Sequence, residues 1–273
     1  ASMRNRGWEL SLNWRGKIGS DIDYSIGGSL SDATAEVTEY ANPTGTNPAG
    51  NWYEGRKVGE IWGYRASGII QTQEEADEYN SKYNLSYLSG TAWTPGDVKY
   101  IDLNNDGKID RGDNNLNNMG DMTIIGNTTP RYQYTINGSI SWKDLSLSVM
   151  FQGVGKRDWD PGTAPYFWGS GAYAQVTVFN EHMDYWREDN KDAYYPKPYI
   201  HSAGGVGPFR NKIMQTSDRY LQSGAYCRLK NITLSYNLPS AWVKKAGMQK
   251  VQVFFSGENL LTFTSLKGMF DPE

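Results

Sequence analysis

The sequence predicts an all-β protein built from antiparallel strand pairs, and it favours a segment of a transmembrane β-barrel over a β-sandwich. Apolar and small polar side chains alternate along six stretches of about ten residues, which is the period of a β-strand. The stretches form three pairs, and the connections between successive stretches are alternately short and very long. Aromatic side chains gather near the ends of the stretches, as they do in barrels at the two membrane interfaces.

The first predicted strand pair covers residues 7–16 and 22–30, with a short connection at 17–21. Every second residue of the first strand is apolar, namely Trp8, Leu10, Leu12 and Trp14. The intervening residues are polar, namely Glu9, Ser11, Asn13 and Arg15. In the second strand Ile22, Tyr24, Ile26 and Leu30 share one parity. Both strands therefore have one apolar and one polar face.

The second and third pairs repeat this design. Residues 132–142 and 145–152 flank a tight turn at Lys143 and Asp144, and they alternate apart from Met150. Residues 231–238 and 251–258 form the third pair, joined through 239–250, with Phe254 as the interruption. Strands of ~9–11 residues with an apolar outer band suit a tilted crossing of a bilayer.

The connections decide between a barrel and a sandwich. An antiparallel sandwich would bury the apolar faces against a second sheet. The segments 31–130 and 153–225, however, are far longer than ordinary sandwich loops. Outer-membrane barrels have short periplasmic turns and long extracellular loops, so we expect both segments to be extracellular. If Trp8, Leu10, Ile136 and Leu234 were covered by another protein layer, this interpretation would fail.

The composition excludes several functional classes. A net charge of −3 without a basic cluster argues against nucleic acid as the main partner. One cysteine, Cys227, excludes an internal disulfide, and two histidines leave little for a histidine-centred site. The mean hydropathy is −0.65, and no run of 18 apolar residues occurs. No nucleophile, zinc or phosphate-loop motif is present, so we do not expect an enzyme.

Residues 102–113 have the spacing of a calcium-binding loop. Asp102, Asn104 and Asp106 occupy positions 1, 3 and 5, and Gly107 stands at position 6, where the chain must turn sharply. The remaining ligands would be the carbonyl of Lys108 and the side chains of Asp110 and Asp113. Asp113 replaces the usual bidentate Glu at position 12, as in dockerin-type loops. The alternative is a solvated turn with incidental acidity. If Ca²⁺ binds, its role is structural, because no pair of flanking helices is readable here.

The two long segments carry further local signals. Residues 71–79 are expected to form a helix, because Thr72 and Glu75 have the spacing of a capping box. The segment 153–225 is rich in aromatic residues. Trp159, Tyr166 and Trp168 are candidate substrate-binding residues, since exposed rings near polar side chains can stack on sugars or grip peptides. The alternative is that these rings form the core of a compact loop.

Several blocks, in order along the chain, resemble one family. They are VGEIWGYRASGII (58–70), GDVKYID (96–102), DGKID (106–110), IGN (125–127), FQG (151–153), SDRYL (217–221), RLKNITLSY (228–236), SGENL (256–260) and FDPE (270–273). With them the chain resembles the C-terminal part of the SusC/RagA family, the TonB-dependent outer-membrane transporters of the Bacteroidetes. The resemblance covers nearly all 273 residues.

The resemblance implies a fold and a function. It implies a barrel of about 22 strands with a plugged lumen, of which this chain supplies the C-terminal part without the plug and the last strand. Such transporters import glycan oligomers, or peptides in the RagA branch, through the outer membrane. They work with a SusD-like lipoprotein that covers the mouth, and with the TonB complex, which contacts an N-terminal region missing here. The resemblance does not choose between the two cargoes.

Two other functions stay open from the residues alone. One is a secreted β-rich glycan-binding module with a dockerin-like calcium loop, which would be soluble without detergent. The weaker alternative is a glycoside hydrolase, although no spacing isolates an acid/base pair of carboxylates.

Overall fold

The computed structural model describes residues 1–162, 164–169, 177–199, 211–267 and 270–273. They form two compact units. The sheet unit comprises residues 5–35, 129–158 and 222–273, and the loop unit comprises residues 1–4, 36–128 and 159–221. None of the helices in the described ranges has the length and apolar character needed to cross a membrane.

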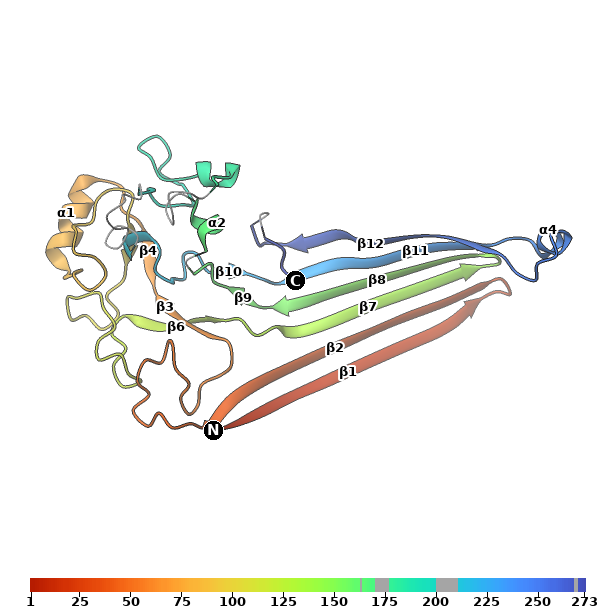
Figure 1. The fold of residues 1–273 in the computed structure, drawn as a ribbon, viewed down its shortest axis with the longest axis horizontal. Helices are drawn as coiled ribbons and strands as arrows, with labels where there is room; N and C mark the ends of the chain where they lie inside the picture. Colours follow the sequence, from red (N-terminus) through yellow and green to blue (C-terminus); the bar gives the residue numbers. More distant parts are fainter. Residues whose placement is uncertain (163, 170–176, 200–210, 268–269) are drawn as a thin grey trace. The chain divides into compact units, whose positions relative to one another are not determined.

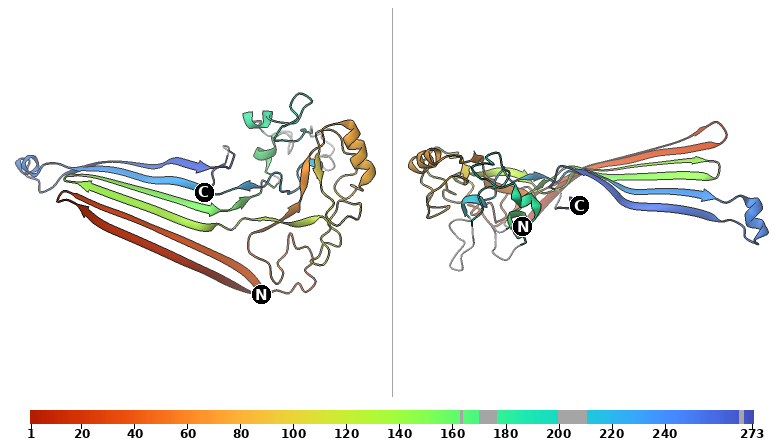
Figure 2. Two further views of the ribbon diagram at one scale, coloured as in Figure 1. Left: turned by 180° about the vertical axis from the view of Figure 1, so that it is seen from behind. Right: turned by 90° about the horizontal axis from the view of Figure 1, so that it is seen from above.

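The long strands form one six-stranded sheet in the order β1-β2-β7-β8-β11-β12 (Figures 1 and 2). Its strands are β1 (Ser2–Ile18), β2 (Ile22–Glu39), β7 (Arg131–Trp142), β8 (Leu145–Lys156), β11 (Tyr226–Asn237) and β12 (Gln252–Thr264). Each of them pairs with the next long strand along the chain, so the three short connections lie at one end of the sheet. All three predicted strand pairs are present, with strands of 12 to 18 residues that are longer than expected.

The register aligns the two faces of the sheet across the strands. On one face, Tyr24 pairs with Ile140, which pairs with Leu147, then Leu234 and Phe255. On the other face, the next row consists of Ser25, Ser139, Ser148, Thr233 and Ser256. The hydroxyl oxygens of Ser25 and Ser139 are 2.8 Å apart, and those of Thr233 and Ser256 are 2.9 Å apart. The alternation seen in single strands thus becomes two continuous faces.

The apolar face of the sheet is open. Trp8, Leu10, Ile136 and Leu234 are 50%, 52%, 52% and 44% exposed. Within the sheet unit the six strands form a single layer (Figure 2). A sandwich would cover these side chains with a second sheet, so the structure excludes the sandwich arrangement for the described part of this unit.

Polar contacts mark the end of the sheet that carries the short connections. The indole N–H of Trp14 donates to the Tyr24 hydroxyl at 3.3 Å. The ammonium of Lys143 lies 5.6 Å from the ring centre of Trp142. The third short connection contains the helix α4 (Ser240–Lys245), whose Trp242 is exposed. Aromatic rings near polar groups suit a membrane interface, where one side of the ring meets water.

A glycine on the polar face allows a close approach of two side chains. A Cβ atom at Gly27 would lie 2.2 Å from Asn13 Oδ1 and 3.0 Å from Asn137 Oδ1. The amides of Asn13 and Asn137 therefore occupy the space that a side chain at position 27 would need. Glycine at this position of β2 lets the amide groups of its two neighbouring strands, β1 and β7, approach each other on the polar face.

The loop unit contains short elements around an aromatic core. Two antiparallel ribbons pair β3 (Glu60–Tyr64) with β6 (Met122–Asn127), and β4 (Ala66–Ile69) with β5 (Val98–Tyr100). The other elements along the long segments are α1 (Gln73–Lys82), β9 (Asp158–Trp159), α2 (Pro165–Trp168), η2 (Asn180–Met183) and β10 (Gln222–Ser223). Tyr64, Trp93, Tyr100, Phe167 and Tyr220 are fully buried. These rings give the long segments a core of their own.

Helix α1 was expected at residues 71–79 and begins two residues later. Thr72 is its N-cap, and its hydroxyl accepts the Glu75 N–H at 3.2 Å, as a capping box requires. The Glu75 carboxylate does not return to Thr72. It accepts the Gln71 N–H at 2.7 Å and pairs with Lys99 of β5. The capping box is therefore half formed, because the Glu75 carboxylate binds the Gln71 N–H and Lys99 instead of the Thr72 N–H.

Candidate functional site

The first half of the 102–113 loop adopts the turn that its spacing predicts. The N–H of Asp106 lies 3.3 Å from Asp102 Oδ1 and 3.1 Å from Asn104 Oδ1. The Gly107 N–H donates to Asp102 Oδ2 at 3.0 Å, and Gly107 has φ of 76°. Glycine adopts this left-handed backbone conformation without steric strain. The three side chains predicted at positions 1, 3 and 5 therefore converge on one turn.

The second half of the loop directs its carboxylates elsewhere. Asp110 Oδ1 accepts the Gly112 N–H at 2.6 Å. Asp113 Oδ2 accepts a hydrogen bond from the Asn118 amide at 3.0 Å, in a separate turn. Within the described residues, no three acidic, histidine or cysteine side chains lie close enough together to hold a metal ion. A cation would thus find the donors of positions 1, 3 and 5 in place and would need the others to move.

A buried carboxylate that sequence reasoning missed holds both ends of this loop. Asp121 is fully buried and accepts the Leu103 N–H at 2.7 Å and the Asp110 N–H at 2.9 Å. Burial raises the pKa of the Asp121 carboxyl, whereas the two backbone hydrogen bonds lower it by a smaller amount. The side chain of Ile109 is also buried, and its N–H donates to the Asn84 carbonyl at 3.1 Å. The loop is therefore anchored on two sides by contacts outside the 102–113 spacing.

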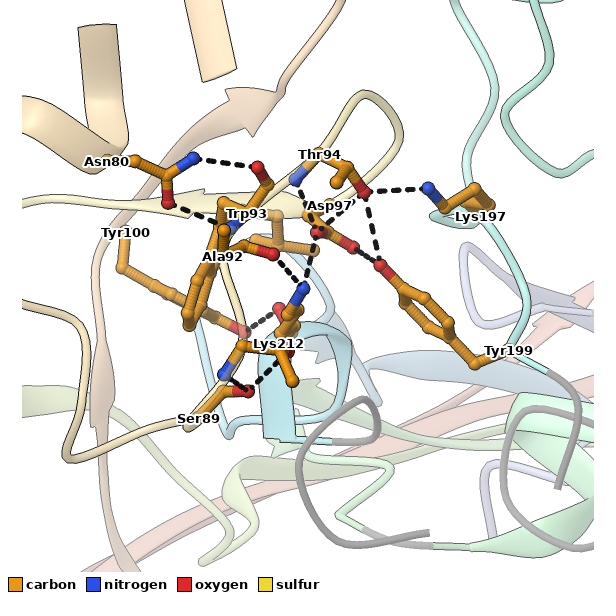
Figure 3. A network of polar contacts seen from close by, with 12 residues as sticks. Asn80, Ser89, Ala92, Trp93, Thr94, Asp97, Tyr100, Lys197, Tyr199 and Lys212 are labelled. Carbon is orange, nitrogen blue, oxygen red and sulfur yellow. Dashed lines mark hydrogen bonds and ion pairs between the residues drawn. The ribbon is translucent and has the colours of Figure 1, made fainter. Parts of the chain in front are cut away.

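A buried ion pair joins the two long segments within the loop unit (Figure 3). The Lys212 ammonium lies 3.4 Å from Asp97 Oδ2, and both side chains are excluded from solvent. The ammonium also donates to the Ala92 carbonyl and lies 5.3 Å from the ring centre of Trp93. Burial lowers the pKa of Lys212, and the Asp97 charge opposes this shift. Asp97 comes from segment 36–128 and Lys212 from segment 159–221, so this pair ties the segments together.

Further polar contacts surround the Asp97 carboxylate. The Thr94 N–H donates to Asp97 Oδ2 at 2.8 Å, and the Tyr199 hydroxyl donates to Asp97 Oδ1. The Lys197 ammonium in turn donates to the Thr94 hydroxyl at 2.8 Å (Figure 3). Burial raises the pKa of Tyr199, and the Asp97 charge adds to the effect. Asp97 is thus satisfied by groups from both long segments, as a buried carboxylate must be.

The three candidate aromatic residues have different environments. Trp168 is buried, and its indole N–H donates to the Gly162 carbonyl at 2.8 Å. Tyr166 is 52% exposed. Trp159 is half-buried and packs edge-to-face on Phe167, with ring centres 5.9 Å apart. The alternative of a loop core therefore describes Trp168 best.

Trp159 also lines a cleft of about 870 Å³ in the loop unit. The strands β3 and β6 supply Trp62, Tyr64 and Met122, and the end of the calcium-like loop supplies Arg111. Tyr166 and Trp168 do not line this cleft. Sequence spacing could not have grouped these residues, since they come from segments about a hundred positions apart.

Comparison with known proteins finds TonB-dependent receptors of similar sequence. No family model matches it. The sequence is 28% identical over 285 residues to TonB-dependent receptor P3 of Formosa agariphila, covering 99% of this chain and 25% of that protein. It is 24% identical over 282 residues to TonB-dependent receptor P26 of the same organism, covering 100% of this chain and 26% of that protein. The chain is related to TonB-dependent receptors. It spans about a quarter of the length of these relatives.

Solved structures share the fold of this chain. The RagAB peptide transporter matches with a TM-score of 0.62 and 21% identity, covering 99% of this chain and 27% of that one. The RagAB peptide importer in the "open-open" state matches with a TM-score of 0.64 and 20% identity, covering 99% of this chain and 26% of that one. The predicted resemblance to SusC/RagA-type transporters and the predicted antiparallel β-barrel segment are both confirmed.

The buried ion pair of Asp97 and Lys212 leads to a prediction. We expect Asp97→Asn to destabilise the loop unit by about 3–5 kcal/mol, because it leaves the Lys212 ammonium buried without a counter-charge. Asp97→Asn combined with Lys212→Met should recover much of this loss. Urea titration followed by limited proteolysis of residues 36–128 measures the effect in the full-length protein.

The matched control is Asp189→Asn, which breaks an exposed pair with Arg187 at 3.0 Å. It should cost about 0–1 kcal/mol. Equal urea midpoints of unfolding for Asp97→Asn and Asp189→Asn would contradict a stabilising role of the buried pair.

Proposed function

We propose that this chain is part of a TonB-dependent importer in the outer membrane of a Gram-negative, Bacteroidetes-like bacterium. Its cargo is an oligomer of sugars or amino acids. A SusD-like lipoprotein covers the extracellular mouth, and a further region of the receptor contacts the TonB complex. The observation that carries this proposal is the exposed apolar face that runs in register across six strands, in a chain related to TonB-dependent receptors.

The physical argument for a membrane location starts from the cost of this face in water. Leu12 and Phe255 are 68% and 75% exposed, and similar side chains continue across the sheet. Each large apolar side chain gains about 1.5–3 kcal/mol on leaving water, so a row of them on every strand strongly favours lipid. The edge strands β1 and β12 need partners in lipid, because unpaired backbone groups are not tolerated there. Additional strands of the intact receptor would close the barrel.

The other parts of the chain have roles that follow from this placement. The hydroxyl and amide side chains of the opposite face would line a wet lumen. The short connections, at one end of the sheet, would be periplasmic turns. The two long segments leave from the other end and would face the medium, where they meet the lipoprotein and the cargo.

Charged substitutions on the two faces test the membrane placement. We expect Leu12→Arg to cost about 2–4 kcal/mol and to reduce the amount of folded receptor, since it puts a charge into hydrocarbon. Ser11→Arg adds the same side chain one residue earlier, on the polar face, and should be tolerated. Heat-modifiable mobility of the receptor in outer-membrane fractions measures the folded amount. Equal yields of the two variants would contradict the assignment of the faces.

Transport itself is tested with labelled oligomers. A host lacking the receptor gene should fail to take up either a labelled glycan oligomer or a labelled oligopeptide, and the intact gene should restore that uptake only when TonB is present. If the protein is soluble and monodisperse without detergent and still binds glycans, the alternative of a secreted glycan-binding module is correct.

We further propose that the 102–113 loop binds Ca²⁺ as a structural ion. The convergence of Asp102, Asn104 and Asp106 on one turn supports this, together with the left-handed Gly107. Asp102→Ala combined with Asp106→Ala should lower the calcium content and expose the loop to trypsin, which cleaves after Lys108 and Arg111. Elemental analysis after equilibrium dialysis and the rate of cleavage at these two residues measure the effect.

The control for the calcium experiment removes two acidic groups elsewhere. Asp77→Ala combined with Glu78→Ala acts on the exposed face of α1 and should change neither readout. If the loop variant keeps its metal content and its protease resistance, residues 102–113 form a plain turn.

A further inference from the structure

The cleft beside β3 contains a buried hydroxyl without a hydrogen-bond partner. Tyr64 is 1% exposed, and its hydroxyl forms no hydrogen bond of normal geometry with a described group. Burial raises the pKa of this hydroxyl, which is protonated at neutral pH even at its ordinary value. Leaving a buried polar group unsatisfied costs about 1–3 kcal/mol. A water, an ion or a bound molecule can satisfy such a group.

Arg111 is the second unsatisfied group that lines the same cleft. The residue is half-buried, and its Nε atom is buried without a hydrogen-bond partner. Within the described residues, its guanidinium forms no ion pair with a carboxylate. The arginines that face carboxylates elsewhere in the chain do pair, such as Arg131 with Asp32 and Arg228 with Asp271. The positive charge of Arg111 lies close enough to Tyr64 to oppose the rise in the pKa of its hydroxyl.

The acidic residues of the cleft are engaged with other groups. Glu60 accepts the Tyr53 hydroxyl at 2.6 Å and the Lys57 N–H at 3.0 Å. Asp160 accepts the Thr216 hydroxyl at 3.1 Å, and burial raises the pKa of its carboxyl. Within the described residues, neither carboxylate forms an ion pair with Arg111, so its guanidinium has no fixed counter-charge in direct contact.

The remaining lining is apolar or aromatic. Leu88, Met122 and Met214 are buried side chains that border the cleft, and Trp62 and Trp159 add rings. A ligand that fills this space therefore combines a hydrogen-bond-accepting anion with an apolar or ring-shaped body. Ligand sites commonly have this mixture of apolar walls and a few polar groups.

We propose that this cleft binds a carboxylate group of the ligand, held by the Arg111 guanidinium and the Tyr64 hydroxyl. A guanidinium matches a carboxylate with two parallel N–H donors, and a phenol can donate a third hydrogen bond. Two sources share this chemistry, the free C-terminus of an oligopeptide and the uronate of an acidic oligosaccharide. The inference rests on the proposed function only in treating the ligand as cargo.

The experiment uses the full-length protein in detergent and four probes measured by isothermal titration. They are the dipeptide Ala-Phe, its C-terminal amide, digalacturonate and its methyl ester. At least one acid should bind, and its uncharged partner should bind about 10- to 100-fold more weakly. Binding of the peptide acid identifies an oligopeptide as the source, and binding of the sugar acid identifies an acidic oligosaccharide.

Substitutions then locate the site. Arg111→Gln should weaken the bound acid about 10- to 100-fold, and Tyr64→Phe should weaken it several-fold without disturbing the fold. Arg111→Lys keeps the charge and should recover part of the affinity. The control Arg65→Gln acts on a half-exposed arginine that pairs with Asp218 at 3.5 Å outside the cleft. It should leave the affinity unchanged.

Three results would overturn the inference. They are equal binding of acid and uncharged partner, unchanged affinity in a folded Arg111→Gln variant, and no binding of any probe. If Arg111→Gln has no effect on the uptake of labelled oligomers, the transport proposal stands and the binding site in this cleft is wrong. If the acid binds at the cleft but no TonB-dependent uptake occurs, the binding site stands and the transport proposal is wrong.

Discussion

The structure depends on one constraint, the two-residue period of the strands held in a single register across the sheet. A slip of one residue between any two strands would move the apolar side chains of one strand to the polar face. The observed pairing instead places Ile140 between Tyr24 and Leu147, and Ser139 between Ser25 and Ser148. The hydroxyl pairs on the polar face add direct contacts that only this register allows. The segregation of apolar side chains to one face and the hydroxyl pairs on the other therefore favour the same register.

The loop unit follows a different physical principle, because its segments lack long strands to hold them. Aromatic packing supplies its core, and the buried pair of Asp97 and Lys212 joins segments more than a hundred residues apart. A buried ion pair adds little stability over an apolar contact, but its loss is costly, so it specifies one arrangement of the segments. A binding surface built on such segments is held in place by the unit itself.

The sequence predicted what short-range patterns determine. Alternation located all six long strands, and the spacing of Thr72 and Glu75 located the start of α1 to within two residues. The same approach could not find Asp121 or Lys212. Their roles come from partners that are distant in sequence, and no local spacing marks them. It also could not separate Trp159, which lines the cleft, from Trp168, which is buried in the core. Aromatic content predicts rings in a loop but not which ring reaches an open surface.

The calcium-like loop and the cleft meet in one residue. Arg111 is the tenth residue of the 102–113 loop, directly after Asp110, whose N–H is held by the buried Asp121 carboxylate. On its other side, the Arg111 carbonyl accepts the Asn114 N–H at 2.8 Å. Contacts that order the loop backbone therefore also limit where the guanidinium can lie. An ordered loop backbone removes part of the conformational entropy cost of binding at Arg111, which is the advantage of a preorganised site. The acidic loop then has a structural reason to be rigid, whether the order comes from Asp121 alone or from Asp121 together with a cation.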